Sequence, residues 1–162
     1  MYYAHRTNSD DVQSWQPLEE HLREVAWLAG EFAEQFGAKQ WGELVGWLHD
    51  AGKYSAEFQS RLRGTPIPVD HSTAGAKLIM ERVSDERLGL ITAYVIAGHH
   101  TGLPDCGNLN GEESCLRQRL NKKVCSHEAF HEEITRLNVP DRAPSIQPGV
   151  DPSFQFSFFI RR

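Results

Sequence analysis

Apolar residues recur at helical spacing through residues 16–37 and predict the first helix of the chain. The apolar positions are Val25, Ala26, Ala29, Phe32, Ala33 and Phe36, and His21 lies on the stripe that Val25, Leu28 and Phe32 continue. Pro17 suits the first turn of such a helix, and Gly37 suits its end. Similar patterns predict four more helices, in residues 40–51, 55–62 (with Ser55 as N-cap), 72–83 and 85–98.

The remainder of the chain is more polar. A helical stretch is expected to continue to about Asn138, and "VPDRAPSIQPG" has the proline and glycine content of a linker. Asp151 suits an N-cap and Pro152 a first helical position, so a further helix is expected to begin there. Because no strand pattern or repeat is visible, we predict an all-α fold. Its expected parts are a helical core in residues 1–138, a linker in residues 139–150, and the start of a truncated terminal helix in residues 151–162.

Length, charge and cysteine content narrow the class of protein. A chain of 162 residues fits one domain with a substantial core. The net charge of −5 argues against a surface that coats nucleic acid, but bound divalent ions could still create a local positive site. No apolar run approaches the roughly 20 residues that span a bilayer, and the N-terminus is not a signal peptide. The three cysteines form no C-x-x-C pair, which favours incidental thiols in a reducing cytoplasm over a zinc site. We therefore expect a cytoplasmic protein with no membrane partner.

Five of the eight histidines fall on core-facing positions or at the ends of predicted helices, and one aspartate adjoins them. These six residues are His21, His49, Asp50, His71, His99 and His100. A single buried histidine is usually a hydrogen-bonded core residue, but five on four helices of a small bundle favour a metal site. Imidazole and carboxylate groups together bind Zn, Fe, Mn, Co or Ni. Neighbouring helix positions point about 100° apart, so one aspartate beside a histidine could bridge two metal ions.

Five sequence pieces between Tyr2 and Asp105 resemble the HD-domain metal-dependent phosphohydrolases. They are "YYAH", "HLREVAWLA", "GWLHDAGKYSAEFQ", "VDHSTAGA" and "AGHHTGLPD". The fuller match is to the HD nuclease of the CRISPR-associated helicase-nuclease of type I systems. This resemblance implies a helical bundle with a metal site at its centre and two divalent transition-metal ions, with Mn, Fe, Ni or Co favoured over Mg or Zn.

The resemblance also implies a role for each residue. His21, His49 and Asp50, together with a late aspartate, would hold one metal ion, and the second ion would be held by Asp50, His71, His99 and His100. Asp50 and Lys53 would be catalytic, with Lys53 near a bound water or the scissile phosphate; the alternative for Lys53 is a solvated lysine at a helix end. His5 would be a supporting residue. His127 and His131, four residues apart, could bind a metal, although a solvated face is the simpler interpretation.

In the family the late aspartate follows a helix that resembles "FQFSFFIRR", and this chain stops at Arg162 before such a run. We therefore expect the chain to be the N-terminal part of a larger helicase-nuclease, with a carboxylate missing from the first metal site. An aromatic helix that ends within about three turns is marginal alone, and it is expected to dock, to pair with something, or to be the stump of a longer protein.

The resulting hypothesis is a metal-dependent single-stranded DNA nuclease of type I CRISPR interference. Its expected partners are single-stranded DNA, the CRISPR effector (surveillance) complex, and a helicase domain in the same or a separate chain. Two alternatives remain. One is a phosphohydrolase of nucleotides, against which the lack of a basic cluster near "HDAGK" argues. The other is a non-catalytic module that binds a partner complex or a helicase chain, and the missing late aspartate favours it.

Overall fold

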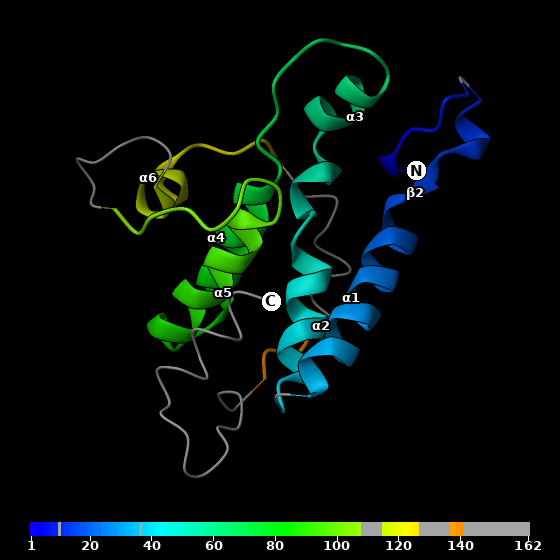
Figure 1. Ribbon diagram of the computed structural model, residues 1–162. Coiled ribbons are helices and arrows are strands. Elements are labelled where there is room, and N and C mark those ends of the chain that lie inside the picture. The colour runs from blue at the N-terminus through cyan, green and yellow to red at the C-terminus, as the bar shows by residue number, and fades with distance from the viewer. Residues whose placement is uncertain (10, 36, 108–114, 127–136, 141–162) are drawn as a thin grey trace.

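The protein is a bundle in which two pairs of helices lie side by side (Figure 1). The computed structural model describes residues 1–9, 11–35, 37–107, 115–126 and 137–140. The first helical pair is α1 (Leu18–Glu34) with α2 (Lys39–Leu48), and the second is α4 (Ser72–Arg82) with α5 (Glu86–Gly98). Between the pairs, the chain passes through the 3₁₀ helix η2 (Ala51–Tyr54) and the short helix α3 (Ala56–Leu62). The all-α prediction is confirmed.

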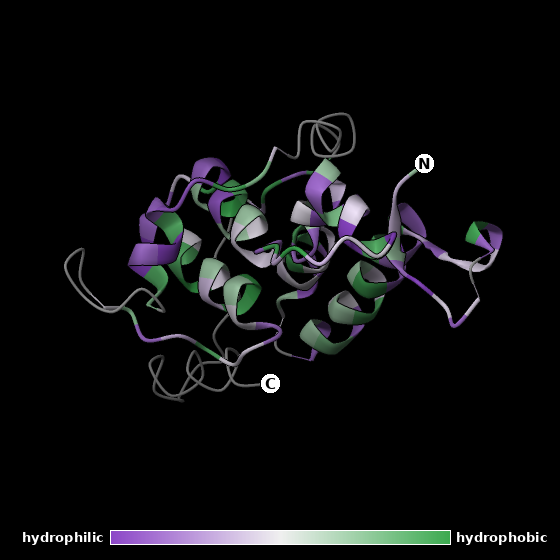
Figure 2. Ribbon diagram, turned by 90° about the horizontal axis from the view of Figure 1, so that it is seen from above, coloured by the Kyte–Doolittle hydropathy of each residue, from purple (hydrophilic) through white to green (hydrophobic). Residues whose placement is uncertain are grey.

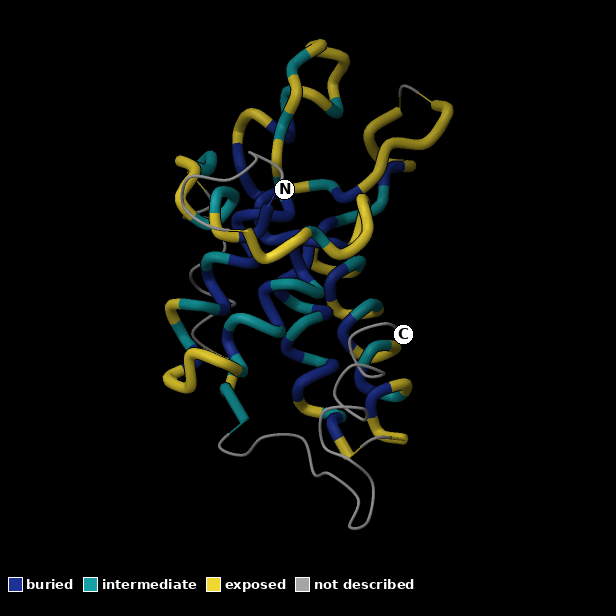
Figure 3. Tube along the Cα trace, turned by 60° about the vertical axis from the view of Figure 1, so that its left-hand side comes forward, coloured by how far each residue is buried: buried dark blue, intermediate teal, exposed yellow. Residues whose placement is uncertain are grey.

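Glycines allow close packing both within the first helical pair and between the two pairs. A Cβ atom on Gly46 of α2 would collide with the backbone of Ala26 on α1. A Cβ atom on Gly75 of α4 would collide with the carbonyl oxygen of Leu48, the last residue of α2. Helix α4 therefore packs directly against the end of α2, immediately before the His49–Asp50 pair. The polypeptide is buried where the helices meet and exposed on their outer faces (Figure 3).

The buried face of α1 differs from the predicted one. It consists of Leu18, Leu22, Ala26, Gly30 and Ala33. Leu28 and Phe32, which we expected on the core stripe, are 46% and 62% exposed. The prediction was right for Ala26 and Ala33, which are buried, and wrong for Leu28 and Phe32. Helix α2 lies so close to α1 that small side chains occupy most of the interface, and these two larger apolar residues face outward. Apolar residues consequently occur on more than the inner face of this helix (Figure 2).

The helical boundaries agree well with the predicted segments up to Gly98. Ser55 is the N-cap of α3, where its Oγ accepts a hydrogen bond from the N–H of Phe58 at 3.2 Å. The expected helix up to Asn138 is wrong as a continuous element. Helix α6 (Leu116–Asn121) ends after six residues, and Lys122 that follows has an extended backbone. Most of the predicted linker and the predicted terminal helix lie in residues 141–162, outside the described part of the chain.

A short strand pair corrects the expectation that the chain has no strands. Strand β1 (Tyr3–His5) pairs antiparallel with β2 (Gln16–Pro17), and a 3₁₀ helix, η1 (Val12–Ser14), lies between them. Strands of two and three residues are too short to show a period-two pattern, and an irregularity in the register obscures it further. The pairing places the N-terminal segment beside the start of α1.

The side chain of Gln59 on α3 fastens this N-terminal segment. Its Oε1 accepts a hydrogen bond from the N–H of Tyr3 at 3.1 Å, and its Nε2 donates to the Tyr3 carbonyl at 3.0 Å and to the Lys53 carbonyl at 2.8 Å. Because Gln59 bonds to both segments, β1 is held against η2. Within the described residues, no helix has both the length and the hydropathy to cross a membrane.

Candidate metal centre

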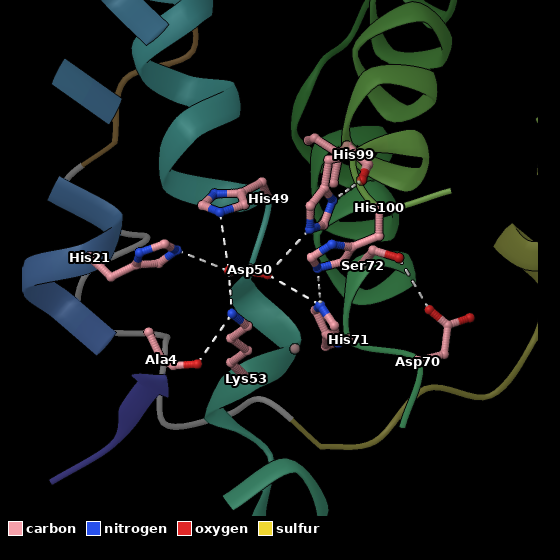
Figure 4. A network of polar contacts seen from close by, with 12 residues as sticks. Ala4, His21, His49, Asp50, Lys53, Asp70, His71, Ser72, His99 and His100 are labelled. Carbon is pink, nitrogen blue, oxygen red and sulfur yellow. Dashed lines mark hydrogen bonds and ion pairs between the residues drawn. The ribbon is translucent and has the colours of Figure 1, made fainter. Parts of the chain in front are cut away.

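Asp50 lies at the centre of a cluster of imidazole groups that come from both helical pairs (Figure 4). Helix α2 ends at Leu48, His49 is its C-cap, and Asp50 precedes η2 with a non-helical backbone. The Asp50 side chain is only 2% exposed. A carboxylate buried to this extent needs partners of opposite charge or hydrogen-bond donors, because an unpaired buried charge is very costly.

The first group of potential metal ligands is His21, His49 and Asp50. The Nε2 atoms of His21, on α1, and of His49 each lie 3.1 Å from Oδ2 of Asp50. Nδ1 of His49 is 2.7 Å from the carbonyl oxygen of Gly46. A carbonyl can only accept, so Nδ1 of His49 carries the proton, and in the neutral ring Nε2 presents its lone pair toward Asp50.

The second group is Asp50, His71, His99 and His100. The Nε2 atoms of His71 and His99 lie 3.3 and 3.4 Å from Oδ1 of Asp50. Nε2 of His100 lies 2.9 Å from Nε2 of His71. His71 precedes α4, and the two consecutive histidines follow α5, so the antiparallel packing of α4 and α5 brings them together. His99 repeats the arrangement of His49, since its Nδ1 lies 2.7 Å from the Ile96 carbonyl oxygen.

The surroundings of Asp50 keep its carboxylate ionised, and burial lowers the pKa of two nearby histidines, His71 and His100. Burial opposes ionisation of Asp50, but polar contacts with His21 and His49 outweigh burial, and the pKa of Asp50 lies far below its usual range. Burial lowers the pKa of His71 to about 4, and the nearby Lys53 acts in the same direction. Burial and the neighbouring His99 also lower the pKa of His100. At neutral pH, His71 and His100 are therefore uncharged and able to bind a metal ion.

Lys53 is buried, in contrast to the alternative of a solvated lysine. Its side chain is 3% exposed, and its Nζ lies 2.7 Å from Oδ2 of Asp50. The same Nζ donates to the Ala4 carbonyl at 3.3 Å and lies 5.4 Å from the centre of the Phe58 ring. Lys53 thus contacts the aspartate that the two ligand groups share. Its expected role beside water or phosphate stays a prediction.

The residues of the cluster fit divalent cations. Oδ1 of Asp50 and Nδ1 of His71 are buried without a hydrogen-bond partner within the described part of the chain. The lone pairs of His49 and His99 point toward carboxylate oxygens, so a proton or a cation has to lie between them. Protonating all five imidazoles would place five positive charges around one carboxylate. Metal ions between the rings and the carboxylate would satisfy these lone pairs while the imidazoles stay neutral. Imidazole with carboxylate is a donor set suited to Mn, Fe, Co, Ni or Zn.

The structure brings all six predicted metal ligands together. One group has four members and the other has three, and Asp50 belongs to both. His5 is exposed, and its ring centre lies 4.9 Å from that of His21, next to the cluster but in neither group. His127 and His131 lie outside the described residues. The three cysteines, Cys106, Cys115 and Cys125, form no disulfide and belong to neither group.

One supporting pair was not singled out from the sequence. Asp70 accepts hydrogen bonds from the backbone N–H of Thr73 at 3.1 Å and from its hydroxyl at 2.7 Å, at the start of α4. Arg119 on α6 reaches Asp70 from another part of the chain, at 3.4 Å. The aspartate before Ser72 and Thr73 has the pattern of a capping residue and could have been noticed. The contact between Asp70 and Arg119 joins residues 49 positions apart, so no local sequence pattern predicts it.

The comparison with known families identifies one match. The HD domain family matches residues 18–129, which include every member of both ligand groups. The comparison with curated proteins finds no match. Because the family match covers more than half of the chain and includes the Asp50-centred cluster, the protein belongs to the HD domain family, which indicates metal-dependent phosphohydrolase activity.

Proposed function

We propose that this HD domain is a metal-dependent nuclease that hydrolyses phosphodiester bonds in single-stranded DNA, acting in type I CRISPR interference. The proposed partners are the DNA strand, the CRISPR effector complex, and a helicase domain in the same or a separate chain. The proposed cellular location is the cytoplasm. Metal-dependent phosphohydrolase activity follows from the family itself, and the substrate and the pathway are the further steps of this proposal.

The observation that carries the proposal is the position of Asp50 between two groups of histidines. Its Oδ2 faces His21 and His49, while its Oδ1 faces His71 and His99. An aspartate with each oxygen directed at a different ligand group is suited to bridging two metal ions. Such a pair supplies Lewis acidity and activates water as a nucleophile toward phosphorus.

The protein residues would prepare the site for this chemistry. The backbone carbonyls of Gly46 and Ile96 fix the protonation of His49 and His99, so that their Nε2 atoms stay available as ligands. Lys53 holds Oδ2 of Asp50 in place from the buried side. His100 belongs to an exposed stretch at the end of α5, whereas Asp50 is buried, so the accessible side of the cluster is at His100. A substrate would approach from there.

Two features favour a DNA strand over a free nucleotide. The segments "DHSTAGA" and "GHHTGLPD" resemble the CRISPR branch of the family. In addition, two basic residues near the second ligand group in the described part of the chain are engaged within the protein: Lys53 with Asp50, and Arg119 with Asp70. A nucleotide phosphohydrolase is expected to offer available cations to a terminal phosphate, which carries more charge than a diester.

The test combines metal content with substrate choice. The protein is purified without chelator, reloaded with Mn²⁺ or Ni²⁺, and analysed by elemental mass spectrometry. The same samples are incubated with end-labelled single-stranded DNA, double-stranded DNA, single-stranded RNA and nucleoside monophosphates. We expect close to two ions per chain and cleavage of single-stranded DNA, with both lost in Asp50→Ala.

Other outcomes would support the alternatives. Release of phosphate from monophosphates, with DNA left intact, would identify a nucleotide phosphohydrolase and refute the nuclease proposal. Fewer than two ions with all substrates intact would favour a non-catalytic module or a centre that needs a further ligand. Adding to the chain a segment that carries the family's late aspartate would then separate these two cases, because only an incomplete centre would gain activity at matched metal concentration.

A further inference from the structure

Arg119, on α6, makes four side-chain hydrogen bonds within the described part of the chain. Its Nε donates to Oγ1 of Thr73 at 3.1 Å, and its Nη1 donates to the carbonyl oxygen of Ala97 at 2.7 Å. Its Nη2 donates to Oγ of Ser72 at 2.7 Å and to Oδ1 of Asp70 at 3.4 Å. The Arg119 side chain is 12% exposed. One guanidinium group therefore contacts two helix ends at once, the start of α4 and the end of α5.

These two helix ends carry the ligands of the second group. His71 lies between two of the four Arg119 partners, Asp70 and Ser72. His99 lies two residues after Ala97, which is another of these partners. The contact of Nε2 of His71 with Nε2 of His100, at 2.9 Å, depends on the separation of these ends. None of the Arg119 contacts involves α1 or α2, which provide His21 and His49.

We propose that Arg119 is a positioning residue that sets the distance between His71 and the His99–His100 pair, and thereby the metal affinity of the second ligand group alone. This inference rests on the metal binding that the proposed function requires. Arginine suits the task because its planar fork can reach several acceptors in fixed directions. A lysine has one nitrogen atom and cannot span the two helix ends in the same way.

The charge of Arg119 does not account for its position by itself. Its carboxylate partner, Asp70, is 43% exposed, and ion pairs at that exposure contribute little to stability. The other three acceptors are uncharged oxygens of Thr73, Ser72 and Ala97. Helix α6 is fastened to α4 a second time, where Nζ of Lys77 donates to the Lys122 carbonyl at 2.9 Å. These contacts connect α6 to the start of α4 and the end of α5 beside the second ligand group, and we call them the Arg119 bracket.

The experiment measures the two metal affinities separately. Mn²⁺ is titrated calorimetrically into the metal-free protein, and the two binding steps are assigned with His21→Ala and His100→Ala, each of which removes a ligand of one group only. We expect Arg119→Ala to weaken the second step by about 10–100-fold, as the loss of groups that orient metal ligands does, and to leave the first step unchanged. Arg117→Ala, an exposed arginine on the same helix, is the matched control and should change neither step.

Arg119→Lys keeps the charge and serves where Arg119→Ala fails to fold. We expect it to retain the fold, with a second step still weaker than in the wild type and an altered visible spectrum of Co²⁺ bound there. Full recovery of affinity by lysine would show that charge alone matters and would overturn the proposal. So would an equal loss at both steps, which indicates a general role in stability, or no loss at all. Wild-type protein that binds two ions but cleaves no DNA would contradict the proposed nuclease and leave the Arg119 result valid.

Discussion

Replacing Asp50 with asparagine tests whether the buried centre is organised around one negative charge. Asn has the same shape as Asp but cannot neutralise the ammonium group of Lys53, which lies 2.7 Å away and is 3% exposed. In Asp50→Asn, the new amide oxygen and the Ala4 carbonyl, which lies 3.3 Å from Nζ of Lys53, can accept hydrogen bonds from Lys53, but neither carries a negative charge. The substitution therefore leaves a buried cation without its counter-ion.

The expected loss of stability can be worked from this geometry. Removing one partner of a buried ion pair costs about 3–5 kcal/mol, because the other charge stays buried and uncompensated. For a domain of this size, about 1 kcal/mol corresponds to about 2–4 °C in Tm, so Asp50→Asn should lower the Tm of the metal-free protein by about 6–20 °C. Total stabilities are only about 5–15 kcal/mol, so the variant is expected to fold but to be marginal.

Differential scanning calorimetry of metal-free protein measures this loss. Adding Lys53→Met to Asp50→Asn removes the uncompensated cation and should recover most of the Tm, although Lys53→Met alone should destabilise the wild type. Mn²⁺ should raise the Tm of the wild type and leave both Asp50→Asn variants unchanged, because ligands stabilise only a state that binds them. If Asp50→Asn cost less than about 1 kcal/mol, or if the two substitutions were additive, the reasoning about the Asp50–Lys53 pair would be refuted.

Three further predictions follow from the same geometry. His100→Ala should weaken the second metal-binding step with little change in helical content, since His100 is exposed; a large loss of circular dichroism signal would instead indicate a structural histidine. Burial lowers the pKa of His71 to about 4 from its ordinary 6.5. Between these two pH values the unfolded chain binds the proton and the folded chain does not. The stability of the metal-free protein should therefore fall as pH decreases from about 6.5 to about 4. A flat melting temperature across this range would contradict that sign. Gly75→Ala would press a methyl group onto the Leu48 carbonyl and should destabilise the fold by about 1–3 kcal/mol. Gly64 has a positive φ, and a Cβ atom there would meet no neighbouring atom, so Gly64→Ala measures the cost of backbone strain alone.

The sequence predicted the helices, and the histidines that gather around Asp50, where the signals are local. Ser55 caps α3 as expected, and the histidines at helix ends converge because antiparallel helices bring such ends together. The buried face of α1 could not be predicted in the same way. Apolar residues occur all around this helix, and the choice of face depends on the glycines of α2, which admit only small residues such as Ala26.

The burial of Lys53 illustrates a second limit of the sequence. The motif "HDAGK" places Lys53 three residues after Asp50, which is compatible with a solvated lysine or with a buried one. The Ala4 carbonyl that accepts a hydrogen bond from Lys53 comes from β1, and β1 is held there by Gln59, 56 residues away from Tyr3. Three short segments with no common local pattern thus decide the environment of one side chain. The bracket formed by Arg119 is hidden from the sequence for the same reason.

Among the described residues, Asp50 is the one carboxylate of the two ligand groups, so a centre that held two metal ions would keep much of their positive charge. Two divalent ions with one aspartate and neutral imidazoles would carry a net charge of about +3, whereas ligand sets rich in carboxylates would neutralise the ions. In a chain with a net charge of −5, attraction for phosphate would then be concentrated at the accessible His100 side of the cluster and would not be spread over a basic face. On the proposed function, affinity for a DNA strand should therefore depend on the bound metal more than on surface lysines and arginines. Asp50 is central to this balance, because within the described residues it is the one member of the two groups that would lower the charge, and the one that both groups share.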